Sequence, residues 1–340
     1  MIEHRIAKLA AGATFILLVI GGTVNPTGSS LACPEPTFIC NGTPFPAMTG
    51  GVLYEHGHRL VAMSVGILQI ILTLLLLLER RRLSILLQPR RLWREIRASD
   101  SKDKRLAWLL LALVIAQGAL GAITVKYKLP WYVSTAHLML GMSYFATLIY
   151  TAFRTRPVPT VMQLDQHERR CMQLGRAARR WIAIACGAVF IQLLLGALVR
   201  HLGGAMVCLG MPTCTIGGDW WPTAGVQHLH MLHRAFGVVV ALVTTIAAIK
   251  VFRAARAWPR LRLLAFLAPL LVCAQVALGV LTVLTMRAVP LAVGHFAGAA
   301  GLWALWMSAW FLTRSRTTST LPAARVVQTD VRVTAQAVAT

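Results

Sequence analysis

Five consecutive residues place a carboxylate, two imidazoles and a guanidinium at the start of a long apolar run. They are Glu55, His56, Gly57, His58 and Arg59. Ionisable groups at a membrane boundary are costly, so a cluster of this kind indicates a functional site. The carboxylate could accept a proton or stabilise a cation, and neutral imidazole is a common metal ligand.

The chain carries a second, altered copy of this cluster. His58-Arg59 recurs 175 residues later as His233-Arg234, and His230 stands at the position that matches Glu55. Other residues repeat at the same spacing upstream: Phe15, Ile16, Leu18, Gly21, Val24 and Cys33 match Phe190, Ile191, Leu193, Gly196, Val199 and Cys208. Downstream the spacing is 158: Ala116, Gln117, Ala119, Leu120, Gly121, Thr124, Val125 and His137 match Ala274, Gln275, Ala277, Leu278, Gly279, Thr282, Val283 and His295. The repeat predicts two tandem halves, of which only the first keeps the carboxylate.

The composition is that of a membrane protein with several spans. Of the 340 residues, 57% are hydrophobic and only 13% are charged, and the mean hydropathy is +0.65. Eight apolar segments reach the length of about 20 residues that a transmembrane helix needs. They lie near residues 7–24, 57–78, 106–125, 131–152, 181–201, 226–249, 261–284 and 289–312. We therefore predict an all-α membrane protein with eight transmembrane helices, arranged as two parallel tandem four-helix bundles.

These segments define the predicted organisation of the chain. A four-helix half covers residues 1–152, a cytoplasmic linker 153–180, a second four-helix half 181–312, and a polar, poorly ordered tail 313–340. The first apolar segment has features of a cleaved signal peptide. Its match to residues in the middle of the chain favours a retained span instead.

Basic residues set the predicted orientation. The loops 79–105, 154–180 and 250–262 hold ten, seven and five Lys and Arg residues, whereas the loop 25–54 holds none. Since cytoplasmic loops carry the excess of basic residues, these loops and both termini are predicted to be cytoplasmic. A net charge of +23 in a soluble protein would suggest nucleic acid, but no exposed basic domain remains outside the spans, so no such partner is expected. The short N-terminal segment lacks a transit peptide, which favours a bacterial plasma membrane.

Each half offers one histidine on its second apolar segment and one on its fourth. The pairs are His58 with His137, and His233 with His295. The predicted topology places all four at similar depth near the outer ends of their helices. Two imidazoles on different helices of one bundle could clamp a flat metal macrocycle as its axial ligands. A single buried histidine is more often a packed core residue, but four at matched positions favour ligands. Zinc fits less well, because two histidines per half leave a tetrahedral shell incomplete.

The residues that flank these histidines leave two interpretations open. Arg59 and Arg234 each follow a histidine directly. Each arginine could be an interfacial side chain whose charged end lies in water, or it could pair with a propionate carboxylate.

The outer loops carry four cysteines in two pairs. Cys33 with Cys40 and Cys208 with Cys214 each share one loop. Oxidising surroundings there favour one disulfide per loop, although the first pair could also be redox-active.

Taken together, these features resemble the haem A synthase family. The resemblance rests on the eight segments, the tandem repeat, Glu55-x-x-His58-Arg59, the three other paired histidines and the two Cys pairs, and it covers about residues 7–312. It implies oxidation of a methyl group of haem O to the formyl group of haem A, by successive hydroxylations, for cytochrome oxidase biogenesis.

The resemblance also implies roles for individual residues. Glu55 would be the essential catalytic carboxylate, and the first Cys pair would be needed for activity. His58 and His137 would be axial ligands of the substrate haem O in the N-terminal half. His233 and His295 would hold a haem b cofactor, with its iron, in the C-terminal half.

The expected partners are haem O, membrane lipid, haem O synthase and an electron acceptor such as a quinone. Two alternatives to an enzyme remain. A non-enzymatic di-haem b-type electron-transfer protein would use the same four histidines, but it gives no reason for a carboxylate in one half only. A transporter or haem chaperone built from parallel repeats would show broken helices at matching positions, which the sequence lacks.

Overall fold

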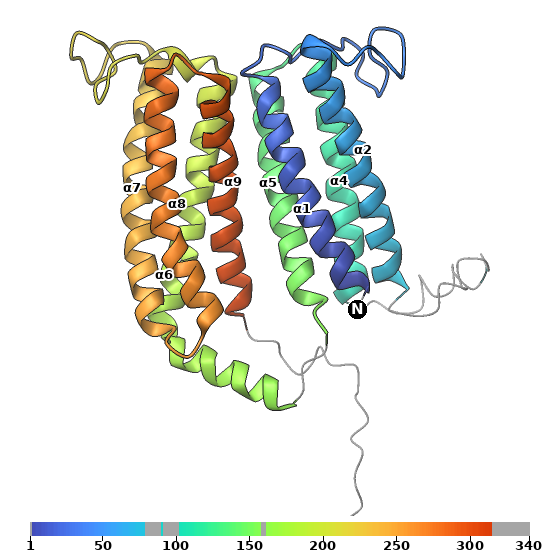
Figure 1. Ribbon diagram of the computed structural model, residues 1–340, viewed down its shortest axis with the longest axis vertical. Coiled ribbons are helices and arrows are strands. Elements are labelled where there is room, and N and C mark those ends of the chain that lie inside the picture. Colours follow the sequence, from blue (N-terminus) through green and yellow to red (C-terminus); the bar gives the residue numbers. More distant parts are fainter. Residues whose placement is uncertain (1, 79–89, 91–101, 158–160, 315–340) are drawn as a thin grey trace, which may run out of the picture.

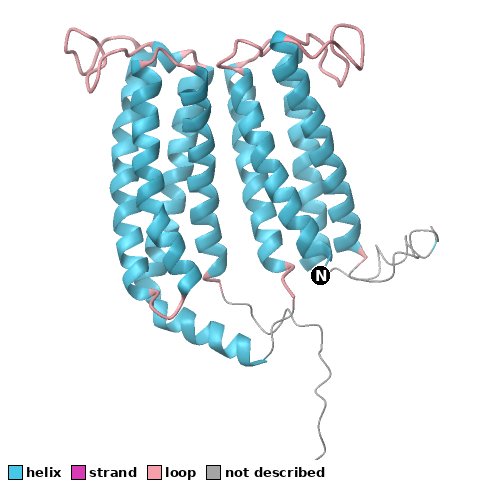
Figure 2. Cartoon of the chain, viewed as in Figure 1, coloured by secondary structure: helices cyan, strands magenta, loops and turns pink. Residues whose placement is uncertain are grey.

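The computed structural model of the chain describes residues 2–78, 90, 102–157 and 161–314. Within these residues it contains eight long helices and no strand beyond one isolated bridge (Figure 2). All eight helices are long and apolar enough to cross a membrane, so the prediction of an eight-span all-α protein is confirmed. The tail after Arg314, which is predicted to be poorly ordered, lies outside the described residues. So does most of the basic loop 79–105.

The helix bounds agree with the predicted spans to within five residues, except at the starts of α2 and α6. The helices are α1 (Ile2–Val24), α2 (Gly50–Leu77), α4 (Lys102–Lys126), α5 (Trp131–Arg154), α6 (Val161–His201), α7 (Gly225–Ala254), α8 (Pro259–Leu284) and α9 (Val289–Leu312). A short 3₁₀ turn, η2 (Gly204–Met206), follows α6. Helix α2 starts before the predicted residue 57, so Glu55 and His56 lie inside the helix. Helix α6 starts before residue 181 and bends at Gly175, whose φ of 73° suits glycine.

The eight helices form two rings of four (Figure 1). In one ring α1 contacts α2, α2 contacts α4, α4 contacts α5, and α5 returns to α1. In the other ring α6, α7, α8 and α9 follow one another in the same way. The helices that carry the paired histidines, α2 and α5 or α7 and α9, therefore stand opposite each other in their ring. The rings meet where α5 and α1 pack against α9 and where α5 packs against α6.

Apolar side chains point both into the rings and out of them. Inside, Leu72 and Trp306 are fully buried, and the Trp303 indole donates a hydrogen bond to the carbonyl of Met142 across the boundary between the rings, at 3.0 Å. Outside, large apolar residues remain exposed along the helices, as expected for a surface in contact with lipid. Examples are Ile16, Ile67, Ile115, Ile184, Leu242 and Leu270.

The loops that follow α1 and α6 lie at the same end of the two rings (Figure 2). The start of α1 and the turn between α7 and α8 lie at the other end (Figure 1). All the paired histidines lie in the half of their helix that is nearer the two loops.

Candidate functional site

The second ring brings two of the predicted ligands together. His233 on α7 and His295 on α9 face each other with ring centres 6.4 Å apart and ring planes at 89°. A metal ion bound by both Nε2 atoms, with bonds of about 2 Å, would set the ring centres roughly 6 Å apart. The spacing therefore fits one iron held between two imidazoles, as in a haem with two axial histidines.

The first ring carries the other predicted pair. His58 lies on α2 and His137 on α5, which stand opposite each other. Both side chains are partly buried, and the Nδ1 atom of each is buried without a hydrogen-bond partner among the described residues. The Gln117 amide of α4 donates to the backbone carbonyl of His137 at 3.0 Å, and Gln192 of α6 donates to that of His233 at the same distance. Similar neighbours thus surround a histidine in each ring.

Glu55 is buried and fully engaged with its surroundings. Its side chain lies one helical turn before His58, and the residue is only 4% exposed. Oε2 accepts a hydrogen bond from the backbone N–H of Cys33 at 2.9 Å, and Oε1 forms an ion pair with Arg59 Nη2 at 2.6 Å. These contacts fix the carboxylate between α2 and the loop that follows α1. A carboxylate has about four lone-pair positions, so Glu55 can still accept a proton.

Arg59 holds the loop that follows α1, and Arg234 holds the loop that follows α6. Arg59 donates to the carbonyl oxygens of Cys33 (2.8 Å), Glu35 (2.6 Å), Thr37 (2.6 Å) and Ile39 (3.1 Å). The predicted propionate pairing stays a prediction, and the contacts present are those of a loop anchor.

Arg234 repeats the arrangement in the second half. It donates to the carbonyl oxygens of Cys208 (2.7 Å), Gly210 (2.8 Å) and Thr213 (2.9 Å). Its Nε is buried and has no partner in the part of the chain that the structure describes. A matched arginine therefore folds both loops, and Cys33 and Cys208, which the repeat pairs, are both acceptors.

Both predicted disulfides are present. Cys33 bonds Cys40, and Cys208 bonds Cys214. The first loop is further ordered by Glu35, whose carboxylate accepts from the backbone N–H groups of Asn41 (3.0 Å) and Gly42 (2.9 Å). Backbone hydrogen bonds, its own amide first, hold the pKa of the exposed Glu35 carboxyl below its usual value.

His56 is a candidate that sequence reasoning undervalued. The residue is 1% exposed, and its Nδ1 has no partner within the described residues. One of its ring nitrogens and the sulfurs of Cys33 and Cys40 all lie within 4.8 Å of one another. The matching residue of the second half, Met231, packs against the other disulfide. The signal available in the sequence was this exchange of Met for His at matched positions.

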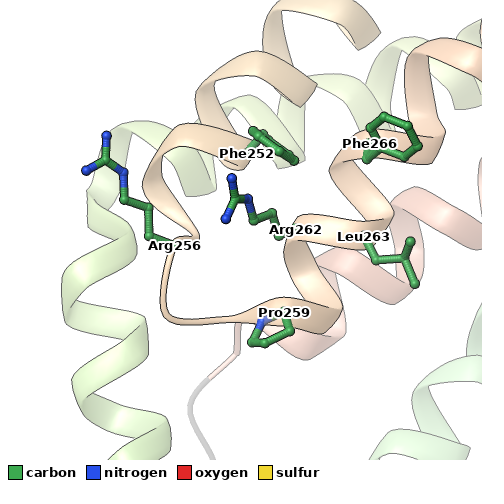
Figure 3. Close-up of a pocket in the computed structure, with 6 residues that line it drawn as sticks. All are labelled: Phe252, Arg256, Pro259, Arg262, Leu263 and Phe266. Carbon is green, nitrogen blue, oxygen red and sulfur yellow. The ribbon is translucent and has the colours of Figure 1, made fainter.

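A hollow of about 320 Å³ lies elsewhere, at the turn between α7 and α8 (Figure 3). It is open, and none of the predicted site residues lines it. Its lining residues are Phe252, Arg256, Pro259, Arg262, Leu263 and Phe266. The turn lies at the end of the second ring that is far from the loops after α1 and α6 (Figure 1). The candidate site is therefore the set of paired histidines with Glu55.

Comparisons with known proteins identify the family to which the chain is similar. The model of the COX15-CtaA family, described as cytochrome oxidase assembly protein, matches residues 47–307. A protein of Symbiobacterium thermophilum named heme A synthase is 28% identical over 245 residues, which are 70% of this chain and 73% of that protein. Proteins of the same name from Shouchella clausii and Bacillus licheniformis are 26% and 23% identical over 294 and 284 residues. These alignments cover 84% and 83% of this chain, and 87% and 86% of those proteins.

Proposed function

The chain belongs to the COX15-CtaA family of cytochrome oxidase assembly proteins, and we propose that it is a haem A synthase. It is an oxidoreductase of the membrane that converts haem O into haem A by oxidising a ring methyl group to a formyl group. The relatives that bear this name cover both rings of the chain. The observation that carries the assignment to a haem enzyme is the facing pair of His233 and His295, with ring centres 6.4 Å apart.

His233 and His295 are the residues that would hold a haem b cofactor. When bound, this group would supply one-electron chemistry and pass the electrons of the reaction to an acceptor. His233 and His295 suit that role because they are partly buried and lie on opposite helices. Neutral imidazoles can hold the haem between them without bringing a charge into the membrane. His58 and His137 would bind the substrate haem O in the same manner in the first ring.

Glu55 is the proposed catalytic residue. In each hydroxylation by water, the methyl carbon gives up two electrons to the acceptor, gains a C–O bond to the water oxygen, and two protons are released. The carboxylate can accept a proton from an attacking water or stabilise positive charge at the carbon that is oxidised. Its contacts with Cys33 N–H and Arg59 hold it in one place before the substrate arrives, which reduces the cost of reorganisation.

The surroundings of the enzyme follow from the topology. We expect a multi-pass protein of a bacterial plasma membrane, with both termini and the basic loops in the cytoplasm and the two disulfide loops outside. Haem O synthase is the expected supplier of substrate, and a quinone is the expected electron acceptor.

A non-enzymatic di-haem electron-transfer protein is the second candidate, because it would use the same four histidines. The buried Glu55, present in one ring only, disfavours it, since electron transfer needs no carboxylate there. The relatives named heme A synthase also disfavour it.

Expression with a source of haem O, in a host that makes no haem A, tests the proposal. Mass spectrometry of extracted haems should reveal haem A only when the protein is produced. Two haems b that stay bound, without any haem A, would establish the electron-transfer protein instead.

A further inference from the structure

Each of the four histidines packs against a glycine on the helix that precedes its own. A Cβ atom added to the glycine would lie 2.7–3.2 Å from Cε1 of the imidazole, closer than real Cβ atoms normally come. The pairs are Gly21 with His58 (2.7 Å), Gly121 with His137 (3.2 Å), Gly196 with His233 (3.1 Å) and Gly279 with His295 (3.1 Å). The missing side chain therefore leaves the space that each imidazole ring occupies.

The four rings lie against these glycines in the same orientation. In every pair Cε1 is nearest to the Cβ position, Nδ1 follows at 3.1–3.7 Å, and Nε2 is farthest at 3.5–4.0 Å. The Cε1 corner of each imidazole thus faces the neighbouring helix, and Nε2 is the ring nitrogen that lies farther from the glycine. Nε2 of His137 also lies 3.4 Å from Nε2 of the Gln117 amide on α4.

The orientation of each imidazole matters because a backbone carbonyl of the neighbouring helix can accept a hydrogen bond from its Nδ1. In an α-helix the N–H of a glycine bonds the carbonyl four residues earlier, and without a Cβ atom this oxygen stays open from the side. The carbonyls concerned belong to Leu17, Gln117, Gln192 and Gln275. His295 Nδ1 lies 3.0 Å from the carbonyl of Gln275.

A metal-bound histidine almost always donates its other ring N–H to such an acceptor, which fixes the tautomer and the ring direction. The Nδ1 atoms of His58, His137 and His233 are buried, and the described residues give them no partner. They face the same place on the neighbouring helix as Nδ1 of His295 does.

We propose that Gly21, Gly121, Gly196 and Gly279 are positioning residues for haem ligation, an inference that rests on the proposed function. Each glycine admits one imidazole against the helix backbone, opens a carbonyl to its Nδ1 and so directs Nε2 into the ring of helices. Gly196 and Gly279 act in this way on the cofactor side, and Gly21 and Gly121 on the substrate side.

Three of the same helices carry a second glycine that serves as a matched control. A Cβ atom at Gly12 of α1, Gly118 of α4 or Gly187 of α6 would meet nothing within 4 Å among the described residues. Gly→Ala at these positions makes the same chemical change and favours the helix slightly. It should leave haem binding unaltered.

The test is the binding of haem by purified full-length variants in detergent, measured by haem b content and by the absorption spectrum. Gly196→Ala and Gly279→Ala should weaken haem b binding about 10- to 100-fold, and should convert part of the remaining haem from six-coordinate to five-coordinate. Gly187→Ala should match the unaltered protein. Gly21→Ala and Gly121→Ala should keep haem b and weaken the binding of added haem O.

A second measurement separates ring positioning from a general effect on the fold. In a His233→Gly variant supplied with free imidazole, the ring is no longer tethered and can move away from a methyl group on α6. Adding Gly196→Ala to this variant should then cost little haem binding. An undiminished loss in this background, or equal haem binding by Gly196→Ala and Gly187→Ala, would overturn the inference. Normal haem b content in His233→Ala would instead overturn the ligand assignment of the proposed function.

Discussion

At the end of the first ring that carries the loop after α1, Arg59 holds four loop carbonyls and the carboxylate of Glu55. At the matching end of the second ring, Arg234 holds three loop carbonyls and, among the described residues, no carboxylate. Both loops are closed by a disulfide of similar span. The second ring therefore demonstrates that this loop folds without an acidic residue beside its arginine. A buried carboxylate that the matched loop lacks is the observation behind the proposed catalytic role of Glu55.

The neighbouring position differs as well. His56 lies against the first disulfide, whereas Met231 lies against the second. The first ring thus has Glu55 and His56 where the second has His230 and Met231, whereas both rings share the next histidine, its arginine and the disulfide loop. Substitutions at these matched positions separate what the loop requires from what the reaction requires.

The largest effect is expected from Glu55→Gln. The amide keeps the shape of the side chain and one acceptor oxygen, but it cannot accept a proton, so haem A formation should fall about 10²- to 10⁴-fold. Quantitative mass spectrometry of haem O and haem A in the membranes measures the change. The control is His230→Gln at the matching position, which should leave the yield unchanged. Equal losses in the two variants would contradict the catalytic assignment.

The next effect concerns the arginines. Arg59→Gln leaves a buried carboxylate without its ion pair, which typically costs about 3 kcal/mol, whereas Arg234→Gln removes no such pair. Thermal unfolding in detergent should therefore rank Arg59→Gln below Arg234→Gln in stability. Adding Glu55→Gln to Arg59→Gln should recover part of the loss. A double variant as unstable as the sum of the single variants would show that the ion pair contributes nothing.

The two disulfides should have similar effects on stability and different effects on activity. Replacing either cysteine pair by serines removes a cross-link of a short loop, worth about 2–3 kcal/mol in the chain-entropy model. Only Cys33→Ser with Cys40→Ser disturbs a loop whose backbone N–H contacts Glu55. Haem A yield should fall in that variant and stay near normal in Cys208→Ser with Cys214→Ser. Equal yields would mean that the first loop does not position the carboxylate.

The smallest effect is expected from His56→Met, which gives the first loop the residue of the second. Methionine packs against a disulfide at the matching position, so the loop should close and the protein should remain folded. Alkylation of free thiols after denaturation should show both disulfides intact, with haem A yield within a few-fold of normal. A loss as large as that of Glu55→Gln would make His56 part of the reaction.

The helices and the paired histidines were predictable from the sequence. Spans of apolar residues are dictated by the thickness of the membrane, and the repeat at spacings of 175 and 158 marked His58, His137, His233 and His295 as equivalent. The start of α2 was not predictable from the sequence, because the residues between Gly50 and Glu55 carry no strong apolar pattern. The start of α6 was not predicted, because the spans were recognised by their apolar residues and the first turns of this helix are polar.

The contacts between residues of the site could not be predicted from the sequence. The sequence places Arg59 beside a histidine, but only the fold of the loop shows that its donors reach Cys33, Glu35 and Glu55. Glycines that pack against a histidine look the same in a sequence as glycines that face open space. Gly196 and Gly187 lie on one helix. A Cβ atom at Gly196 would meet the His233 ring, whereas one at Gly187 would meet no described residue within 4 Å.

The division of labour between the rings is tested most directly by identifying the haems that remain bound to His58→Ala and to His233→Ala. Both variants are purified in the presence of haem O, and the extracted haems are identified by mass. We predict that His233→Ala loses haem b and still binds haem O, whereas His58→Ala keeps haem b and loses haem O. The same haem lost from both variants, or the reverse assignment, would contradict a substrate site in the first ring and a cofactor site in the second.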